Sequence, residues 1–371
     1  MTRIKDVIAR FEQFAPQSLA EKGDPVGLQL GDVNQPLKKM MVTLDVRPEV
    51  VKEAIQNKVN FIFAHHPAMF RPVKHFDLSV PQNQMYAELI KHDITVYGAH
   101  TNLDNVNGGM NDWLADLLQI KETSPLMPAR YEKYYKLAVF VPDEYAESMR
   151  QALSQAGAGE LGDYTACSYS IQGQGRFKPG KDAHPFIGTQ DKLEETAEEK
   201  VEVVLPARLK DQVLDAMLAV HPYEEPAYDL YELEHVGQPY GMGRIGQLEN
   251  PLTVKEYAEF CKQALKIKHL RIVTDDTSRL VKRVAVLGGS GSHFFPAAVR
   301  KHADVYVTAD VTYHTGHDII ASGLSVIDPG HHFESICKPH LQKLFEKWNE
   351  ENGWGIEVIQ SKLNTDPFIY L

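Results

Sequence analysis

Apolar segments alternate with helix-forming segments through the first hundred residues of this chain, and this alternation limits the folds open to it. The expected elements are a helix at 4–14 and then strands and helices in turn at 39–45, 48–57, 59–64, 82–91 and 94–99. Regular strand–helix alternation is typical of β-α-β units, in which helices connect parallel strands. The pattern therefore predicts an α/β fold around a parallel sheet.

Three predicted strands end in side chains that commonly bind metals. One ends at His65-His66-Pro67, the next at His100 with a loop carrying Asp104, and a third runs past residue 328 into Gly-His-His-Phe-Glu at 330–334. Active sites of open parallel sheets gather at such strand ends. Nitrogen and oxygen donors without a thiolate suit zinc, iron, manganese or nickel. The candidate metal ligands are His65, His66, Asp104, His331 and Glu334.

These five donors exceed what one tetrahedral ion needs once positions are kept open for substrate. A pair of ions bridged by a carboxylate or a hydroxide is the better fit. The alternative is that each histidine is an ordinary hydrogen-bonded residue, which is the commoner role of a lone histidine at a strand end. His65 and His66 can serve one site only if the chain turns between them, because adjacent strand residues face opposite sides. Pro67 allows such a turn.

Several motifs, in this order, resemble the family of GTP cyclohydrolase 1 type 2 homologues, also called the Nif-three-like family. They are DPVGLQLG (24–31), TLDV (43–46), HHP (65–67), HTNLDN (100–105), GG (108–109), GMGRIG (241–246), GGSG (288–291) and DVTYH (310–314), leading to His331 and Glu334. The resemblance covers residues 1–127 and 238–371. Departures from the family pattern are Gly23 in place of Trp, Leu287 in place of a small residue or Cys, and Ala309 in place of Gly.

The resemblance implies a two-lobed α/β core and a dinuclear divalent-metal site on the five candidate ligands, with zinc the first choice among zinc, iron, manganese and nickel. It also implies a ring-shaped homohexamer. The family name suggests opening of the guanine ring of GTP, but the family has no settled reaction. The interval from His331 to Glu334 is one residue shorter than in some members, which leaves His332 as a rival ligand to His331.

The middle of the chain differs from its two ends in composition and in the order of its predicted elements. Residues 121–128 are polar, contain two prolines and are interpreted as a domain boundary. Two strand–helix–strand halves follow, each opening on a strand that ends in proline (AVFVP, 138–142; EVVLP, 202–206), which indicates a weak internal duplication. We therefore expect a ferredoxin-like α+β domain at 128–237, similar to the regulatory-protein-like module of longer family members, inserted between core parts at 1–127 and 238–371.

Three further motifs have two readings each. HPYEEP (221–226) is expected to cap a helix and start the next strand, although it could hold a ligand. Gly241, Gly243 and Gly246 satisfy the dinucleotide-binding fingerprint but lack the helix that the fingerprint must open, so they are read as a false match. The turn at 288–292, between a strand and a helix, suits a phosphate cradle and a plain tight turn equally.

Composition excludes some classes of function. The net charge of −11, from 39 basic and 50 acidic residues, argues against sequence-independent binding of nucleic acid. Cys167, Cys261 and Cys337 have no paired spacing, so no disulfide framework is expected. No segment approaches the length of about 20 apolar residues that a membrane helix needs. We expect a cytoplasmic protein without a membrane partner.

A metal pair makes hydrolysis the economical reaction class. Proton transfer then needs a side chain near the ions, and the candidates are His100 and His314, with Asp310 or Tyr313 to orient them. Asp45 could instead fix a ligand imidazole. The expected substrate is a nucleotide-like or phosphorylated small molecule, and the alternatives are a non-catalytic metal-handling protein or a ligand-sensing scaffold.

Overall fold

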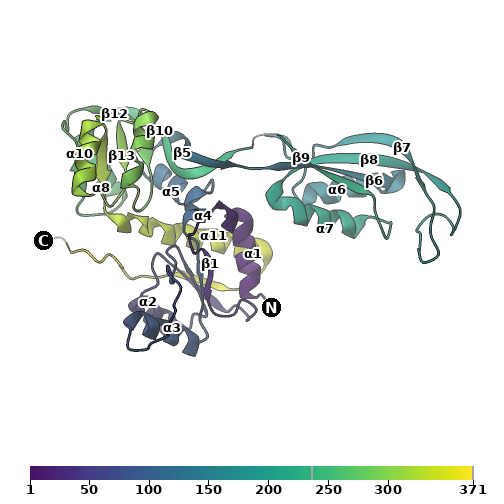
Figure 1. Cartoon of the computed structure of the whole chain (residues 1–371), viewed down its shortest axis with the longest axis horizontal. Coiled ribbons are helices and arrows are strands. Elements are labelled where there is room, and N and C mark those ends of the chain that lie inside the picture. The colour runs from purple at the N-terminus through teal and green to yellow at the C-terminus, as the bar shows by residue number, and fades with distance from the viewer. Residues whose placement is uncertain (235–236, 370–371) are drawn as a thin grey trace. The chain divides into compact units, whose positions relative to one another are not determined.

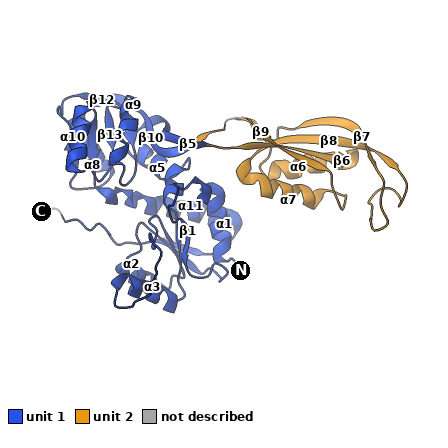
Figure 2. Ribbon diagram, in the orientation of Figure 1, with its two compact units in different colours: residues 1–130, 240–371 blue, residues 131–239 orange. Residues whose placement is uncertain are grey.

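The computed structural model describes residues 1–234 and 237–369. The chain forms two compact units (Figure 2), Met1–Arg130 with Tyr240–Leu371 and Tyr131–Pro239. The sequence placed these boundaries at 127/128 and 237/238. The polar segment 121–128, which the sequence suggested as the boundary, belongs to strand β5 (Lys121–Tyr131), and this strand ends at the junction of the two units. β5 is an edge strand, and an edge strand tolerates prolines such as Pro125 and Pro128.

The first sheet of unit 1 has five strands in the order β1-β4-β3-β2-β15, of which β4, β3, β2 and β15 are parallel. In Figure 1 this sheet is found at the label β1. Its strands are β1 (Gly27–Leu30), β2 (Lys39–Thr43), β3 (Phe61–Ala64), β4 (Thr95–Gly98) and β15 (Glu357–Gln360). The associated helices are α1 (Ile4–Phe14), α2 (Pro48–Gln56), α3 (Pro81–Lys91), α4 (Thr101–Asn105), α5 (Met110–Leu117) and α11 (Cys337–Asn352). The predicted strand–helix alternation is confirmed here.

Apolar side chains on both faces of the first sheet are buried. On one face, Phe61 and Phe63 of β3 pack with Phe11 of α1 and Phe345 of α11. On the other face, Ile62 of β3 belongs to a cluster formed with α2 and α3. Burial on both faces explains why the strand at 61–64 is a continuous apolar run rather than an alternating one.

The second sheet of unit 1 has the order β11-β14-β13-β12-β10-β5, with β12, β13 and β14 parallel. Besides β5, its strands are β10 (Pro239–Thr253), β11 (Arg271–Val273), β12 (Leu280–Val286), β13 (Val305–Val307) and β14 (Ser325–Asp328). Its helices are α8 (Val254–Ala264), α9 (Phe295–Arg300) and α10 (Tyr313–Ala321). α8 begins at a capping box in which Thr253 and Glu256 bond reciprocally. The apolar core against α8 is continuous with the core of the first sheet.

Unit 2 has one antiparallel sheet in the order β7-β8-β6-β9. Its elements follow the chain as β6 (Tyr134–Pro142), α6 (Ala146–Gln155), β7 (Tyr169–Phe177), β8 (Glu194–Pro206), α7 (Lys210–Val220) and β9 (Tyr228–Leu233). Both helices pack on the same apolar face of this sheet (Figure 2). The acidic run at 194–199 forms the first half of β8. Among the described residues, no helix has the length and apolarity to cross a bilayer.

Candidate metal centre

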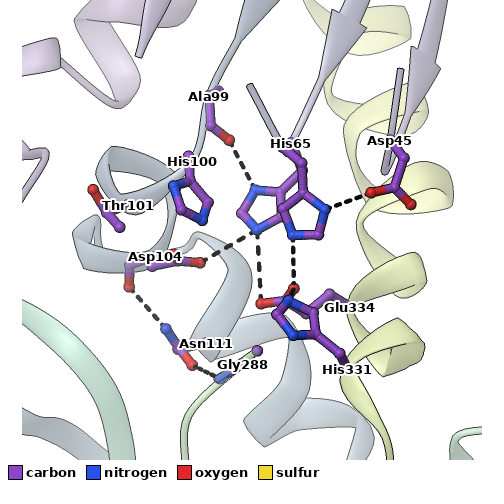
Figure 3. Close-up of polar contacts among 12 residues, drawn as sticks. Asp45, His65, Ala99, His100, Thr101, Asp104, Asn111, Gly288, His331 and Glu334 are labelled. Atoms are coloured by element: carbon purple, nitrogen blue, oxygen red, sulfur yellow. Dashed lines mark hydrogen bonds and ion pairs between the residues drawn. The ribbon is translucent and has the colours of Figure 1, made fainter. Parts of the chain in front are cut away.

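The candidate ligands converge between the carboxyl ends of strands from both sheets of unit 1 (Figure 3). His65 and His66 follow β3, and Asp104 lies on the short helix α4 after β4, where the sequence suggested a loop. His331 and Glu334 lie on a 3₁₀ helix, η5 (His331–Ile336), which follows β14. Residues three apart eclipse each other in a 3₁₀ helix, so both side chains face the same way.

Glu334 lies at the centre of the cluster and faces histidines with both oxygens. Its Oε1 is 3.7 Å from His65 Nε2, which is 3.8 Å from Asp104 Oδ1. Its Oε2 is 3.1 Å from His66 Nε2 and 3.2 Å from His331 Nε2. Two donors about 2.1 Å from one tetrahedral ion lie roughly 3.4 Å apart. The spacing therefore fits metal coordination in which Glu334 is a central ligand.

Three sets of donors lie close enough for one ion each, with the ligand atoms of a set within 4.8 Å of one another. They are His65 with His66 and His100, His66 with His331 and Glu334, and His65 with Asp104 and Glu334. The second and third sets share only Glu334. His100, predicted as a proton carrier, is thus also placed as a donor.

Each histidine of the cluster is held by its Nδ1 atom. His65 Nδ1 lies 2.8 Å from the Ala99 carbonyl oxygen, which fixes the N–H on Nδ1. Carboxylates hold the other rings: Asp45 with His66 at 2.7 Å, Asp24 with His100 at 2.8 Å and Asp310 with His331 at 2.7 Å. Such partners orient metal-binding imidazoles and leave Nε2 free for the ion.

Two buried ligand atoms of the cluster, His65 Nε2 and Asp104 Oδ1, have no hydrogen-bond partner among residues 1–234 and 237–369. His65 is 0% exposed and Asp104 is 7% exposed. Leaving polar groups of this kind unsatisfied costs about 1–3 kcal/mol each. A cation between them would satisfy both, so the residues fit a bound metal.

Ionisation in the metal-free protein reflects the crowding of charge. Burial opposes the charged form of His66, but its hydrogen bonds with Asp45 and Glu334 prevail and raise its pKa to about 10. The hydrogen bond to Glu334 raises the pKa of His331 to about 9 despite burial. Burial raises the pKa of Asp104. Burial also opposes the charged form of Glu334, but its contacts with His331 and His66 and the charge of the nearby histidines hold its pKa well below the ordinary value. Glu334 is therefore the permanent anion of the cluster.

The glycines at the end of β12 make room for Glu334. A Cβ on Gly288 would lie 2.7 Å from Glu334 Oε1, and one on Gly289, whose φ is +60°, would lie 2.9 Å from it. The Gly288 N–H donates to Asn111 Oδ1 at 3.0 Å. The structure thus favours the tight-turn reading of 288–292 over the phosphate cradle.

Two histidines named in the sequence lie outside the donor sets. His314 is exposed on α10, where its ring centroid lies 5.4 Å from that of Tyr313. His332 belongs to none of the three sets, so the geometry favours His331 over His332 in the cluster. The Nε2 atom of His332 is buried and has no hydrogen-bond partner within the described part of the chain. Asp24 was not recognised as a partner of His100, because no local pattern reveals a contact between residues 76 positions apart.

The remaining motifs have structural roles. His221 ends α7, and both of its ring nitrogens are used, by the Phe140 carbonyl oxygen at 2.9 Å and the Tyr223 N–H at 3.1 Å. The glycines at 241–246 lie within strand β10 and open no helix, as expected of a false match. Arg244 between them is 1% exposed and pairs with Asp112 through two hydrogen bonds of 2.7 Å.

Comparisons with known proteins agree over nearly the whole chain. The family model described as Duf34/NIF3 (NGG1p interacting factor 3) matches residues 2–367. A Bacillus subtilis protein named GTP cyclohydrolase 1 type 2 homolog is 45% identical over 367 residues, covering 99% of this chain and 98% of that protein. The crystal structure of a Bacillus cereus protein related to NIF3 has a TM-score of 0.91 at 40% identity, covering 100% of this chain and 99% of that one. A Staphylococcus aureus protein of known structure has a TM-score of 0.73 at 30% identity, with the same coverage.

Proposed function

Because this chain belongs to the Duf34/NIF3 family, whose curated relatives are named GTP cyclohydrolase 1 type 2 homologs, we propose that it binds two divalent metal ions and hydrolyses a nucleotide-like or phosphorylated small molecule. The observation that carries the proposal is the carboxylate of Glu334, which faces His65 with one oxygen and His66 and His331 with the other. A bridging carboxylate between two sets of imidazole ligands is the arrangement that a dinuclear centre requires.

In this proposal His65, Asp104 and Glu334 hold one ion, and His66, His331 and Glu334 hold the other, zinc being the first candidate. Bound ions of this kind supply Lewis-acid chemistry and lower the pKa of a water molecule. Asp45 and Asp310 keep the ligand rings in one orientation. His100, oriented by Asp24, moves the proton at its second ring nitrogen. His314 is exposed and would need a rearrangement to take part.

Metal analysis and turnover, measured on the same samples, test the proposal. The Asp104→Ala variant should lose about one equivalent of metal together with hydrolysis of some member of a panel of nucleoside triphosphates and dinucleotides. Asp116→Ala, on the exposed face of α5, is the matched control and should retain both. If the metal-loaded protein leaves the whole panel intact, hydrolysis of such substrates is refuted. Exchangeable metal without turnover would instead support the metal-handling alternative.

A second candidate function belongs to unit 2, which we interpret as an inserted ferredoxin-like, regulatory-protein-like domain that senses a ligand. A cavity of about 730 Å³ in this unit favours it. Phe140, Phe177 and Tyr223 contribute to its lining, and Gly173 of β7 leaves side-chain space open on that strand. A metabolite that raises the melting temperature of the full chain, but not of a Phe177→Asp variant, would establish such sensing. Deletion of 131–239 should leave the metal content unchanged.

Assembly and location complete the proposal. We propose a homohexamer that acts in the cytoplasm without nucleic-acid or membrane partners. Sedimentation equilibrium tests the assembly, since the 41.8 kDa chain would then behave as a particle six times that mass. A monomeric or dimeric species at micromolar concentration would contradict it.

A further inference from the structure

A cavity of about 470 Å³ adjoins the metal cluster. Its lining includes the two ligand histidines His66 and His331 on one side and the segment 364–368 on another. A molecule in this cavity would therefore touch the centre where the proposed reaction takes place. Neither the family comparison nor the proposed function assigns a role to the residues that close it.

The segment that closes the cavity is fixed in place by hydrogen bonds. Ser361 Oγ donates to Glu53 Oε2 at 2.6 Å, and the Lys338 ammonium donates to the Leu363 carbonyl oxygen at 2.9 Å. The Thr365 hydroxyl donates to the outer oxygen of Asp45, whose other oxygen holds His66. The wall of the cavity is thus tied directly to the orientation of a metal ligand.

Two of the side chains that line the cavity, those of His332 and Arg47, have nitrogen atoms without a hydrogen-bond partner among the described residues. The Nε2 atom of His332 is buried and has no hydrogen-bond partner. The Arg47 side chain is 59% exposed, and its nearest carboxylate, Glu49, lies 4.0 Å from Nε. That distance is too long for a hydrogen bond, so the guanidinium keeps its donors for another group. An arginine with free donors is suited to the oxygens of a phosphate.

The carboxylates of the cavity are largely engaged. Asp45 and Asp310 each hold a histidine Nδ1, and Asp366 accepts the backbone N–H of Phe368 at 3.0 Å. The fourth lining carboxylate, Glu49, is 53% exposed and so lies largely in solvent. Their remaining negative charge would repel an anion from the metal-free protein. Two divalent cations beside the cavity would reverse that balance, so binding of an anion here should require the metals.

We propose that this cavity receives the phosphate group of the substrate, with Arg47 and His332 as its direct contacts and the segment 364–368 as its wall. The inference rests on the proposed function, because a phosphate in this position is useful only beside an occupied metal centre. The residues given to the phosphate here do not include the glycine turn at 288–292, whose space Glu334 occupies.

Calorimetric titration with inorganic phosphate tests the inference on the full chain, loaded with metal and freed of excess metal by gel filtration. Arg47→Gln should weaken phosphate binding by about tenfold or more, the loss expected for a charge-assisted hydrogen bond, and should leave the metal content unchanged. His332→Gln should also weaken phosphate binding with the metals retained. Arg300→Gln, at an exposed position on α9, is the control and should bind phosphate like the unaltered chain.

The outcomes separate this inference from the proposed function. Full metal content together with unchanged phosphate affinity in Arg47→Gln would overturn the phosphate site and leave the metal centre standing. Absence of phosphate binding by the metal-loaded chain would do the same. A chain that takes up no metal would refute both proposals, and phosphate binding that persists after the metals are removed would contradict the charge argument on which the site depends.

Discussion

Replacing Asp45 with asparagine isolates the electrostatic contribution of a residue that supports the metal centre. Asp45 accepts hydrogen bonds from His66 Nδ1 and from Thr365. In Asp45→Asn the amide oxygen can still accept from His66, while the amide nitrogen can donate to the Thr365 hydroxyl. The shape and both contacts are kept, and only the negative charge is lost.

The expected loss of metal affinity follows from the geometry of the Asp45–His66 contact. The Asp45–His66 contact is 2.7 Å long, and the Asp45 side chain is 25% exposed. Removal of such a partner weakens metal binding by about 10- to 100-fold, equivalent to about 1.4–2.7 kcal/mol. Asp310 holds His331 at the same distance but is 42% exposed, so solvent screens its charge more. We therefore expect a smaller loss in Asp310→Asn than in Asp45→Asn.

Competition with a chromophoric chelator for zinc measures these affinities. Asp116→Asn, distant in sequence from all ligands and exposed, serves as the control and should match the unaltered chain. Metal affinity in Asp45→Asn within twofold of the control would refute the argument that Asp45 supports the centre through His66. A larger loss in Asp310→Asn than in Asp45→Asn would refute the ranking by solvent exposure.

Three further predictions concern the same unit. Gly289→Ala should lower the metal content and should lower the stability by about 1 kcal/mol or more, because a φ of +60° disfavours alanine and the new Cβ would meet Glu334. Gly316→Ala, where a Cβ has space, is the control and should keep its metal. Equal metal content in the two variants would contradict the steric argument. Arg244→Met should destabilise the chain to urea by about 1.5–3 kcal/mol, because the Asp112 carboxylate loses two charge-assisted hydrogen bonds while it keeps the one from the Gly108 N–H. A loss under about 1 kcal/mol would show that the pair is dispensable. The raised pKa values of His66 and His331, about 10 and about 9, mean that both rings are doubly protonated and positively charged at neutral pH without metal. Metal binding should therefore release protons and weaken as the pH falls. Calorimetry in two buffers of different ionisation enthalpy measures that release, and its absence would contradict the raised pKa values.

The sequence predicted the elements of unit 1 well where apolar periodicity was strong. The helix at 4–14 has the predicted bounds because Ile4, Val7, Ile8 and Phe11 form one buried stripe. Residues 121–131 were misread because prolines usually interrupt strands, and only the sheet order reveals that β5 is an edge strand. Asp104 was placed beside the correct strand end, but the one-turn helix that carries it was too short to have a periodic signal.

The centre of the site was more predictable than its supports. Strand ends and ligand types alone brought out the residues that converge on Glu334. Asp24 and Thr365 were not assigned their roles, because each meets its histidine or carboxylate through a tertiary contact that leaves no pattern along the chain. His314 was singled out because it follows a strand end, but the turn into α10 carries its side chain to the surface.

The donors on η5 follow the donors on α4 by about 230 residues, with all of unit 2 translated in between. At a synthesis rate of about 5–20 residues per second, a growing polypeptide spends roughly 10–45 seconds with His65, His66 and Asp104 made and His331 and Glu334 still missing. A nascent chain cannot assemble the cluster around Glu334 during that interval. The complete cluster can therefore form only after Glu334 has been made, and chains terminated before that residue are left without it.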